Sequence, residues 1–314
     1  MDSLRGRDFV SLRDLNGEEI KGIFFLTQEL KEEQKRGEPH PYLNGKTLAM
    51  IFHKPSARTR ISFELGMYQL GGYAINLTDQ EIQMGKRESV EDIGRLLSRY
   101  NDAIMIRTFE HHLVEELAEA ATIPVINGLT DLGHPCQVLT DIFTIWEKRG
   151  SLAGLKVVFV GDGNNVAYSW FYGAALTGMH FVLACPSGYS VSPDIVGDAS
   201  KIASRSGGRL EIINSPFDAV READVIYTDV WISMGQEKER DARLQAFKGY
   251  QVNSSLVKQA KKDVLVMHCL PAHRGEEITD EVMDGPHSIV FDEAENRLHV
   301  QKALLVKLIG SGKF

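Results

Sequence analysis

The sequence predicts an α/β protein with two doubly wound parallel-sheet domains, one in each half of the chain. The first observation is length, because 314 residues correspond to two domains of about 150 residues each. The second is that most short apolar runs are continuous rather than alternating, which is typical of strands buried on both faces of a parallel sheet. The third is that amphipathic stretches separate these runs, and such alternation favours α/β units with right-handed crossovers.

Ten apolar runs are predicted as strands, four in the first half of the chain and six in the second. Helical patterns lie between them; for example, Ile61, Leu65 and Tyr68 fall on one face of a predicted helix. The predicted strands are 46–53, 73–77, 102–106, 122–126, 155–161, 180–185, 209–213, 224–229, 263–268 and 288–292.

A domain boundary is predicted near residue 149, where Lys148-Arg149-Gly150-Ser151 separates the two series of strands. The first domain would therefore comprise 1–148 and the second 149–294. The last amphipathic stretch, roughly 297–309, has no strand after it, so the pattern alone allows it to pack on either domain.

Composition excludes several classes of protein. No apolar run approaches the roughly 20 residues that span a bilayer, and the first ten residues lack the apolar region of a secretory signal. Lys and Arg number 35 against 43 Asp and Glu, a formal net charge of −8 without a long basic run, which argues against general nucleic-acid binding. Three cysteines, Cys136, Cys185 and Cys269, are too few for a disulfide framework. A cytoplasmic protein with reduced thiols is expected.

Polar residues follow three predicted strands of the first half, and ligands of parallel sheets bind beyond the carboxyl ends of strands. Ser56 is a good N-cap, and a helix start with Arg58 nearby favours an anion. Arg107 directly follows the third strand. His134 precedes Pro135, which suits a first helical position, and Gln137 comes one turn later. Each segment alone is also compatible with an ordinary capped helix or a solvated ion pair.

Three predicted strands of the second half are also followed by polar residues. Gly161-Asp162-Gly163-Asn164-Asn165-Val166 resembles a dinucleotide fingerprint, but Val166 takes the third glycine position, and the next strand ends without an acid for a ribose. Two asparagines at a helix start could instead hold the charged groups of an amino acid. Asp229 begins a long polar connection to about residue 250, which is either a mobile lid or a surface insertion. Cys269 follows the strand 263–268.

The cysteine and the histidines are compatible with two other chemistries. Zinc could use His134, His268, Cys269 and His273, but neither CxxC nor HExxH spacing is present, so no metal is expected. Cys269 could also be a nucleophile with a histidine base. The whole set favours group transfer instead: the first half supplies cations for an anionic substrate, and the second supplies an acid and amides for an amine. The substrates would meet in a cleft between the domains.

Four motifs, taken together, resemble the ornithine carbamoyltransferases. They are Ser-Ala-Arg-Thr-Arg at 56–60, His-Pro-Cys-Gln at 134–137, Asp-Val-Trp-Ile-Ser-Met-Gly at 229–235 and His-Cys-Leu-Pro at 268–271. Their order and spacing match, and the resemblance extends from Phe9-Val10-Ser11-Leu12 to the final helix. It implies carbamoyl transfer from carbamoyl phosphate to the side-chain amine of ornithine, giving citrulline and phosphate in arginine biosynthesis, without a cofactor. It also implies a homotrimer or an assembly of trimers, and a C-terminal segment, 295–314, that packs back on the first domain.

The resemblance implies a role for each matching residue. Arg107, His134 and Thr59 would donate to the carbonyl oxygen, Gln83 would act from a neighbouring subunit, and Arg297 would reach back from the last helix. The implied carbamoyl phosphate-binding residues are Ser56, Ala57, Arg58, Thr59, Gln83, Arg107, His134, Gln137, Cys269, Leu270 and Arg297; the implied ornithine-binding residues are Asn165, Asp229, Ser233 and Met234; and the implied catalytic residues are Arg107, His134, Asp229 and Cys269.

The reacting amine explains why an acid and a thiol are expected beside it. An alkyl amine with a pKa near 10.4 is only roughly 0.1% deprotonated at pH 7.4, yet only the neutral form attacks. Because the amine attacks directly, no acyl-enzyme on Cys269 is expected. Two residues depart from the family: Ala57 stands where threonine is common, so one phosphate contact is lost, and His53 stands where an acid is frequent.

Several alternatives remain open at this point. Within the family, the acceptor could be aspartate, putrescine or N-acetylornithine, although aspartate carbamoyltransferases usually read Pro-Leu-Pro where this chain has Cys269-Leu270-Pro271. Putrescine lacks the carboxylate that Ser233 and Met234 would bind. A nucleotide-dependent oxidoreductase and a non-catalytic binding protein are the alternatives from other classes.

Overall fold

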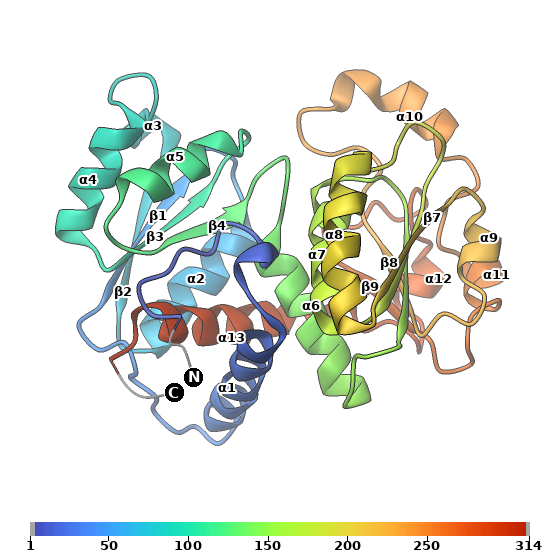
Figure 1. Cartoon of the computed structure of the whole chain (residues 1–314), viewed down its shortest axis with the longest axis horizontal. Helices are drawn as coiled ribbons and strands as arrows, with labels where there is room; N and C mark the ends of the chain where they lie inside the picture. Colours follow the sequence, from blue (N-terminus) through green and yellow to red (C-terminus); the bar gives the residue numbers. More distant parts are fainter. Residues whose placement is uncertain (1–3, 312–314) are drawn as a thin grey trace. The chain divides into compact units, whose positions relative to one another are not determined.

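The computed structural model describes residues 4–311 and divides into two compact units (Figure 1). One unit contains the chain up to Phe143 together with the segment from Asn296 onwards, and the other runs from Thr144 to Glu295. The chain passes between the units inside helix α6 (Pro135–Arg149) and inside helix α13 (Val290–Ile309). The boundary predicted at residue 149 is the last residue of α6. None of the helices within 4–311 combines the length and apolarity needed to cross a bilayer.

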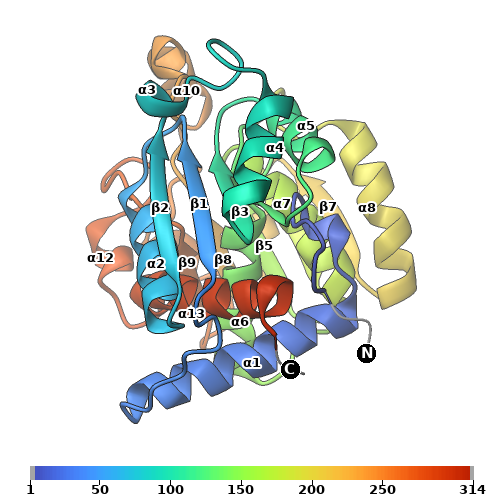
Figure 2. The same cartoon turned by 90° about the vertical axis from the view of Figure 1, so that its left-hand side faces the viewer.

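The first unit is built on a four-stranded parallel sheet in the order β2-β1-β3-β4. Figure 2 shows β2, β1 and β3 side by side in this order. On one face, α4 and α5 pack on apolar side chains of β1 and β3. The buried strands are short and continuously apolar, as expected for a sheet covered on both faces. The elements are η1 (Leu12–Asp14), α1 (Gly17–Lys35), β1 (Thr47–Phe52), α2 (Ala57–Gln69), β2 (Tyr73–Thr78), α3 (Asp79–Ile82), α4 (Val90–Tyr100), β3 (Ala103–Arg107), α5 (His112–Ala120) and β4 (Val125–Leu129).

The second unit is built on a five-stranded parallel sheet in the order β7-β6-β5-β8-β9. Figure 1 shows α7 and α8 along one face of this sheet, and α9, α11 and α12 pack on the other through a continuous apolar cluster. The elements are β5 (Lys156–Val160), α7 (Asn165–Thr177), β6 (His180–Ala184), α8 (Pro193–Ser206), β7 (Arg209–Ile213), α9 (Pro216–Ala219), β8 (Val225–Thr228), η2 (Glu237–Glu239), α10 (Arg240–Ala246), α11 (Ser254–Val257), β9 (Leu265–His268) and α12 (Asp280–Met283). The predicted fold class, two parallel-sheet α/β units, is confirmed.

Two predictions about local structure were wrong. The run 288–292 is not a strand: Ser288 makes one isolated bridge with Val266, and α13 begins at Val290. Asp292 and Glu293 lie in the first turn of α13, where acidic side chains favour a helix start. The strand predicted at 122–126 lies at Val125–Leu129 instead, after Pro124, whose ring nitrogen cannot donate to a sheet ladder.

Helix α2 turns the predicted apolar face to the solvent. Ile61 and Tyr68 are 60% and 77% exposed, whereas Phe63 and Met67 are fully buried against the rest of the unit. A helix this short can carry apolar side chains on two faces, and the periodicity does not say which face meets the sheet. Exposed apolar side chains gathered on one helix face are typical of a surface that contacts another chain.

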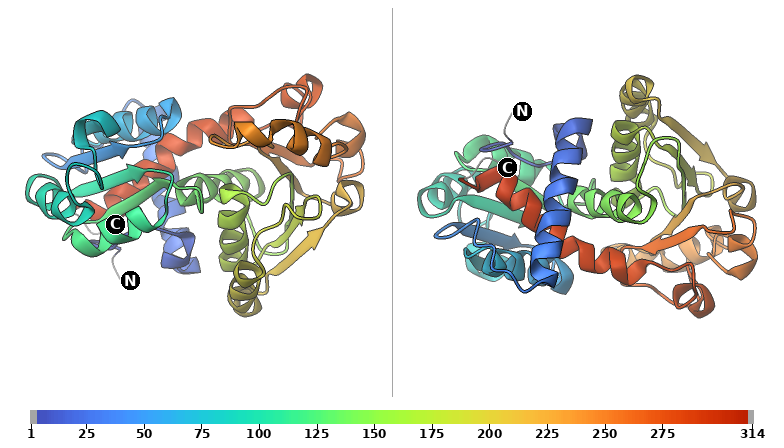
Figure 3. Two further views of the ribbon diagram at one scale, coloured as in Figure 1. Left: turned by 90° about the horizontal axis from the view of Figure 1, so that it is seen from above. Right: turned by 90° about the horizontal axis from the view of Figure 1, so that it is seen from below.

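The C-terminal part of α13 is held in the first unit by a buried lysine. Lys302 is fully buried, and its Nζ donates to Gln34 Oε1 at 2.8 Å and Gln69 Oε1 at 2.9 Å and lies 3.1 Å from His40 Nε2. Gln34 belongs to α1, which crosses α13 (Figure 3). Burial lowers the pKa of Lys302 to about 8. These contacts fix α13 and therefore the position of Arg297.

Replacing Lys302 by methionine should change how stability depends on pH. The folded-state pKa of about 8 lies below the ordinary 10.5, so between these values the unfolded chain binds the extra proton and stability rises with pH. Relative to the variant, the wild type should therefore gain about 2–3 kcal/mol in free energy of unfolding between pH 7 and pH 10.5. Denaturant unfolding of both proteins at each pH tests this, and parallel pH profiles would contradict it.

Candidate active site

In the first unit, the start of α2 has the features of a candidate anion site. Ser56 caps the helix, and its Oγ accepts from the backbone N–H of Thr59 at 3.2 Å. Thr59 is fully buried, and Ala57 is the first helical residue. The N–H groups of a first helical turn have no intrahelical acceptor and, with the helix dipole, they favour a negative charge.

Two arginines distant in the sequence converge on this helix start. Thr59 Oγ1 accepts from Arg107 Nη1 at 3.4 Å and from Arg297 Nη2 at 3.0 Å. Arg107 is the last residue of β3, and its carbonyl oxygen accepts from the N–H groups of His53 and Lys54, which fixes the backbone there. Both arginines are buried. Two guanidinium groups at one helix start in an acidic protein indicate a site for phosphate or carboxylate.

His134 is a neutral imidazole among cations. Its side chain is buried beside the start of α6, and burial, followed by Arg297, Arg107, Arg58 and Lys54, holds its pKa well below the ordinary 6.5. The structure thus brings together Arg58, Arg107, His134 and Arg297, as the resemblance implied. A neutral imidazole can donate an N–H to an uncharged carbonyl oxygen and stabilise the negative charge that develops there.

Gln137 is buried one turn into α6 with a fixed orientation. Its Nε2 donates to Asp141 Oδ1 at 2.8 Å. Because a carboxylate can only accept, this bond shows which end of the amide is the nitrogen, and Oε1 is the end that would accept from an NH2 group. The orientation fits the role implied for Gln137.

Lys54 is a member of this cluster that sequence reasoning missed. It is buried, its Nζ lies 3.1 Å from Asp131 Oδ1, and it sits 4.9 Å from the ring centroid of Phe109. Lysines are rarely buried, so composition gave no reason to single it out. The available signal was its position, because it follows β1 just before Pro55 and Ser56.

Gln83 and His53 lie outside the cluster. Gln83 is exposed at the end of α3, with a left-handed φ of 44°, and its Nε2 donates to Gln80 O at 3.3 Å. His53 Nδ1 lies 3.0 Å from Thr108 Oγ1, and its Nε2 is 3.8 Å from Asp79 Oδ1. His53 therefore links the end of the sheet to the segment that carries Gln83.

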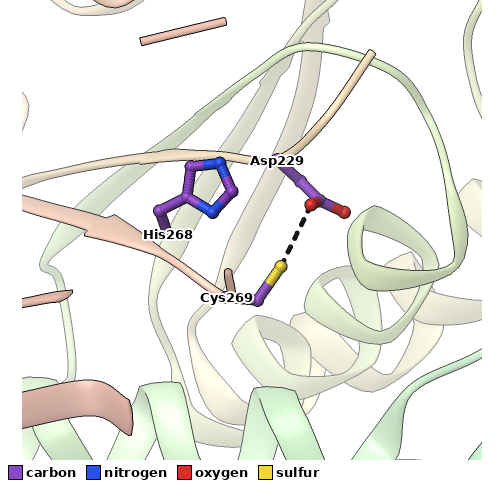
Figure 4. A group of neighbouring side chains, drawn as sticks. All are labelled: Asp229, His268 and Cys269. Carbon is purple, nitrogen blue, oxygen red and sulfur yellow. Dashed lines mark hydrogen bonds between the residues drawn. The ribbon is translucent and has the colours of Figure 1, made fainter. Parts of the chain in front are cut away.

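In the second unit, Asp229 is the centre of a hydrogen-bonded group after β8 (Figure 4). Its Oδ1 accepts from Cys269 Sγ at 3.1 Å and from the N–H of Val230 at 2.8 Å, and its Oδ2 accepts from Asn164 Nδ2 at 2.7 Å. Asn164 also caps α7 by accepting from two backbone N–H groups. Sequence reasoning chose Asn165, the first residue of α7, and missed the orienting role of Asn164.

The segment after Cys269 is held by His268. His268 Nδ1 accepts from the N–H of Leu270 at 2.9 Å, so the proton is on Nε2, which lies 3.0 Å from Glu277 Oε1. Leu270 has a φ of 60°, an uncommon value for a branched side chain. These bonds set the direction of the backbone carbonyls that follow β9.

Asp229, His268 and Cys269 also offer three possible metal ligands within 4.8 Å of one another. In the hydrogen-bonded arrangement, however, both ring nitrogens of His268 are engaged and the thiol of Cys269 donates to Asp229. A cation could bind only by breaking these bonds. The expectation that the protein works without a metal or cofactor stays a prediction.

The Gly-rich turn after β5 is filled by protein. The N–H of Gly163 donates to Tyr189 O at 2.7 Å, and a Cβ on Gly163 would lie 2.6 Å from the nitrogen of Val191. The glycine is thus required for close packing of two chain segments, and its N–H is already bonded, so it is not available to a pyrophosphate. This disfavours the oxidoreductase alternative.

The polar connection after Asp229 is partly helical rather than a structureless insertion. It contains η2 and α10 and is anchored by Arg243, whose Nη1 donates to Asp162 Oδ2 at 2.8 Å and to Trp231 O at 3.1 Å. Burial raises the pKa of Asp162, opposed by Arg243. Ser233 is half-buried and Met234 is exposed at the tip.

Comparisons with known proteins agree with this geometry over the whole chain. Residues 7–147 match the family model for the aspartate/ornithine carbamoyltransferase carbamoyl-P binding domain, and residues 153–308 match that for the Asp/Orn binding domain. The chain belongs to the aspartate/ornithine carbamoyltransferase family. This confirms the resemblance found in the sequence motifs.

Individual relatives are similar over nearly their full length. The ornithine carbamoyltransferase of Anoxybacillus flavithermus is 55% identical over 306 residues, covering 98% of each chain. The anabolic ornithine carbamoyltransferase of Pyrococcus furiosus is 54% identical over 312 residues, covering 99% of each. The solved structure of ornithine carbamoyltransferase from Pyrococcus furiosus has a TM-score of 0.97 and 53% identity over all of both chains.

Proposed function

We infer that the protein transfers the carbamoyl group of carbamoyl phosphate to the side-chain amine of L-ornithine, giving L-citrulline and phosphate. The observation that carries this inference is the convergence of Arg107 and Arg297 on Thr59 at the start of α2, inside the segment matched as a carbamoyl-P binding domain. Relatives that are 53–55% identical over the full chain are named ornithine carbamoyltransferases. An assignment to arginine biosynthesis follows from the relative named as anabolic.

The first unit is proposed to hold the electrophile. Ser56, the N–H of Ala57, Arg58 and Thr59 bind the phosphate, aided by Arg107 and Arg297. Arg107, His134 and Thr59 donate to the carbonyl oxygen, and Gln137 Oε1 accepts from the carbamoyl NH2. As the amine nitrogen bonds to the carbonyl carbon, negative charge moves onto that oxygen, where these donors stabilise it. The C–O bond to phosphate then breaks, and phosphate leaves with the electron pair.

The second unit is proposed to hold the nucleophile. Asp229 and Cys269 lie beside the reacting amine and orient its lone pair, and the Asp229 carboxylate accepts the proton that the amine loses. Asn165, Ser233 and Met234 bind the α-amino and carboxylate groups. Carbonyl oxygens of Cys269 and Leu270 accept from the carbamoyl NH2. The hydrogen bonds from Asn164 and Cys269 to Asp229 support this role, because they hold the carboxylate in one orientation. No group on the path needs a metal or an acyl-enzyme.

The direct test measures phosphate release from carbamoyl phosphate with ornithine, putrescine, aspartate and N-acetylornithine, each alone, with the ureido product identified by mass. Release with ornithine alone is expected. Release with a different amine would keep carbamoyl transfer but refute ornithine as the acceptor. No release with any amine would refute the activity.

Replacing Arg58 by alanine should raise the KM for carbamoyl phosphate about 10- to 100-fold and change the KM for ornithine little. The guanidinium is half-buried near His134, and hydrogen bonds to a charged group contribute about 1.5–3 kcal/mol. Arg60→Ala is the matched control, because Arg60 is exposed on the same helix and pairs with Glu64 at 3.1 Å. Equal losses for both substrates would contradict the phosphate site.

A homo-oligomer, a trimer or an assembly of trimers, is part of the proposed function. It is supported by exposed apolar side chains around edge strand β2 and on the helices α2 and α4. Exposed edge strands and exposed apolar side chains are typical of surfaces that contact another chain. Gln83 is exposed at the end of α3, which directly follows β2 in the sequence. It would reach the carbamoyl phosphate of a neighbouring subunit. The exposed side chains are Ile61, Leu65, Tyr68, Tyr73, Ile75, Leu96 and Tyr100.

A cytoplasmic location is also proposed, since the three cysteines are free thiols.

Charged substitutions on this face should dissociate the protein and abolish activity. Tyr68→Glu combined with Ile61→Asp is expected to give monomers in sedimentation, because both side chains are more than half exposed and would be desolvated in an interface. Phe217→Ser, which removes an exposed aromatic from the second unit, is the control.

Mixing subunits that carry Gln83→Ala with subunits that carry His134→Gln should restore activity in hybrids. A fully active monomer would contradict the proposal.

A further inference from the structure

Two backbone N–H groups at the tip of the 231–247 segment are occupied by side chains of the same segment. The N–H of Ser233 donates to Gln236 Oε1 at 3.0 Å, and the N–H of Gly235 donates to Glu237 Oε1 at 3.0 Å. Gly235 has a φ of 98°, which turns the chain so that both N–H groups are presented within three residues. Backbone N–H groups that a turn presents close together can form a site for a carboxylate.

The base of this segment is fixed, in contrast to its tip. Arg243 is buried, its Nη1 bonds Asp162 and the carbonyl oxygen of Trp231, and its Nε donates to Glu239 Oε2 at 2.9 Å. Met234 and Glu237 are exposed. These anchors restrict any rearrangement of the segment to the residues between them.

We propose that Gln236 and Glu237 stand in for the α-carboxylate of the amino-acid substrate, by occupying the N–H groups of Ser233 and Gly235 until that carboxylate displaces them. The proposal rests on the proposed function, in which Ser233 and Met234 bind that end of ornithine. The chemistry matches, because Glu237 presents the same functional group as the substrate. A bound Glu237 also repels an incoming carboxylate until it moves away.

A consequence for specificity follows. An amine with an α-carboxylate can replace both side-chain acceptors and draw the tip into its bound form. Putrescine carries no carboxylate, so Gln236 and Glu237 keep the N–H groups and the tip stays in its resting form. These two residues would therefore weaken ornithine binding and leave putrescine unaffected.

The test compares Gln236→Ala and Glu237→Ala with the wild type and with Asp241→Ala. Asp241 is exposed on α10, so its loss removes one negative charge from the same segment without touching Ser233 or Gly235. Each of the first two variants should lower the KM for ornithine about three- to tenfold, the effect of removing one competing hydrogen bond. The dissociation constant of L-norvaline, which has the α-amino acid group but no side-chain amine, should fall equally. Asp241→Ala should keep the wild-type KM for ornithine and the wild-type dissociation constant for L-norvaline, and the dissociation constant of putrescine should be the same in every variant.

Either of two results would overturn the proposal. A higher ornithine KM in Gln236→Ala or Glu237→Ala would mean that these side chains contact the substrate. An equal fall in Asp241→Ala would mean that only net charge matters. As a control for folding, each variant should unfold at the same temperature as the wild type. Failure of wild-type protein to use ornithine would refute the proposed function itself, which separates the two hypotheses.

Discussion

Replacing Asp229 by asparagine is expected to lower kcat by two to four orders of magnitude, the usual contribution of a positioned acid or base. The carboxylate accepts from Cys269, Val230 and Asn164, so it is held in one orientation beside the proposed amine. An asparagine of the same shape offers one acceptor and one NH2 group, which would face the donors Cys269 or Asn164. The amine would then lose both its orientation and its proton acceptor. Steady-state kinetics with each substrate varied measures the effect.

A carboxylate at the opposite end of the same strand provides the control. Asp224 precedes β8, is equally buried, and accepts from the N–H of Lys156 at 2.8 Å and from Lys261 Nζ at 2.7 Å. Asp224→Asn should therefore reduce the free energy of unfolding and leave kcat nearly unchanged. Asp229→Asn should still bind carbamoyl phosphate. If its pH–rate profile matched that of the wild type, Asp229 would not be acting at the amine.

Features that depend on runs of residue type were predictable from the sequence. Nine of the ten predicted strands are present, because a strand buried on both faces needs a continuous apolar run. The strand predicted at 288–292 is absent because a short apolar run also suits a buried helix start. The acids Asp292 and Glu293 favour the helix here. Ile61, Leu65 and Tyr68 share one face of α2, as their helical spacing predicted, but spacing does not say whether such a face meets the sheet or the solvent.

Candidate site residues could be selected from the sequence where a residue type is unusual at its position. They could not be selected where only the contacts in the folded protein distinguish them. Arg107 and His134 follow strands, where ligands of parallel sheets bind, so they could be selected from the sequence. In the sequence, Lys54 and Asn164 are compatible with ordinary structural roles, those of a solvated lysine and a helix cap. Only the fold shows that Lys54 is buried and that Asn164 orients Asp229.

The environment of His134 explains why arginines and a histidine occur together. At its ordinary pKa an imidazole would be partly charged near pH 6.5. Burial, with Arg297, Arg107, Arg58 and Lys54 nearby, keeps it neutral in the folded protein. In the proposed mechanism, the arginines therefore carry the charge that binds phosphate, and His134 supplies a neutral donor for the carbonyl oxygen.

Replacing His134 by glutamine is expected to lower kcat about 100- to 1000-fold, the cost of removing one donor to a developing oxyanion. His112→Gln, at an exposed histidine of the same unit, should have wild-type kcat. The wild-type imidazole should titrate well below pH 6.5 when it is followed by NMR. Because its pKa is lowered on folding, the unfolded chain binds more protons below pH 6.5, so His134 makes the protein less stable as the pH falls through that range.

Arg297→Gln separates the electrostatic effect on His134 from the effect of burial. Removing this guanidinium leaves the imidazole buried but takes away the positive charge that lowers its pKa most. The pKa of His134 should therefore rise toward 6.5 while the protein stays folded. The NMR titration of the variant, without substrate, measures that rise. An unchanged midpoint would mean that burial alone keeps His134 neutral, and the arginines would then serve phosphate binding without setting the charge of the proposed oxyanion donor.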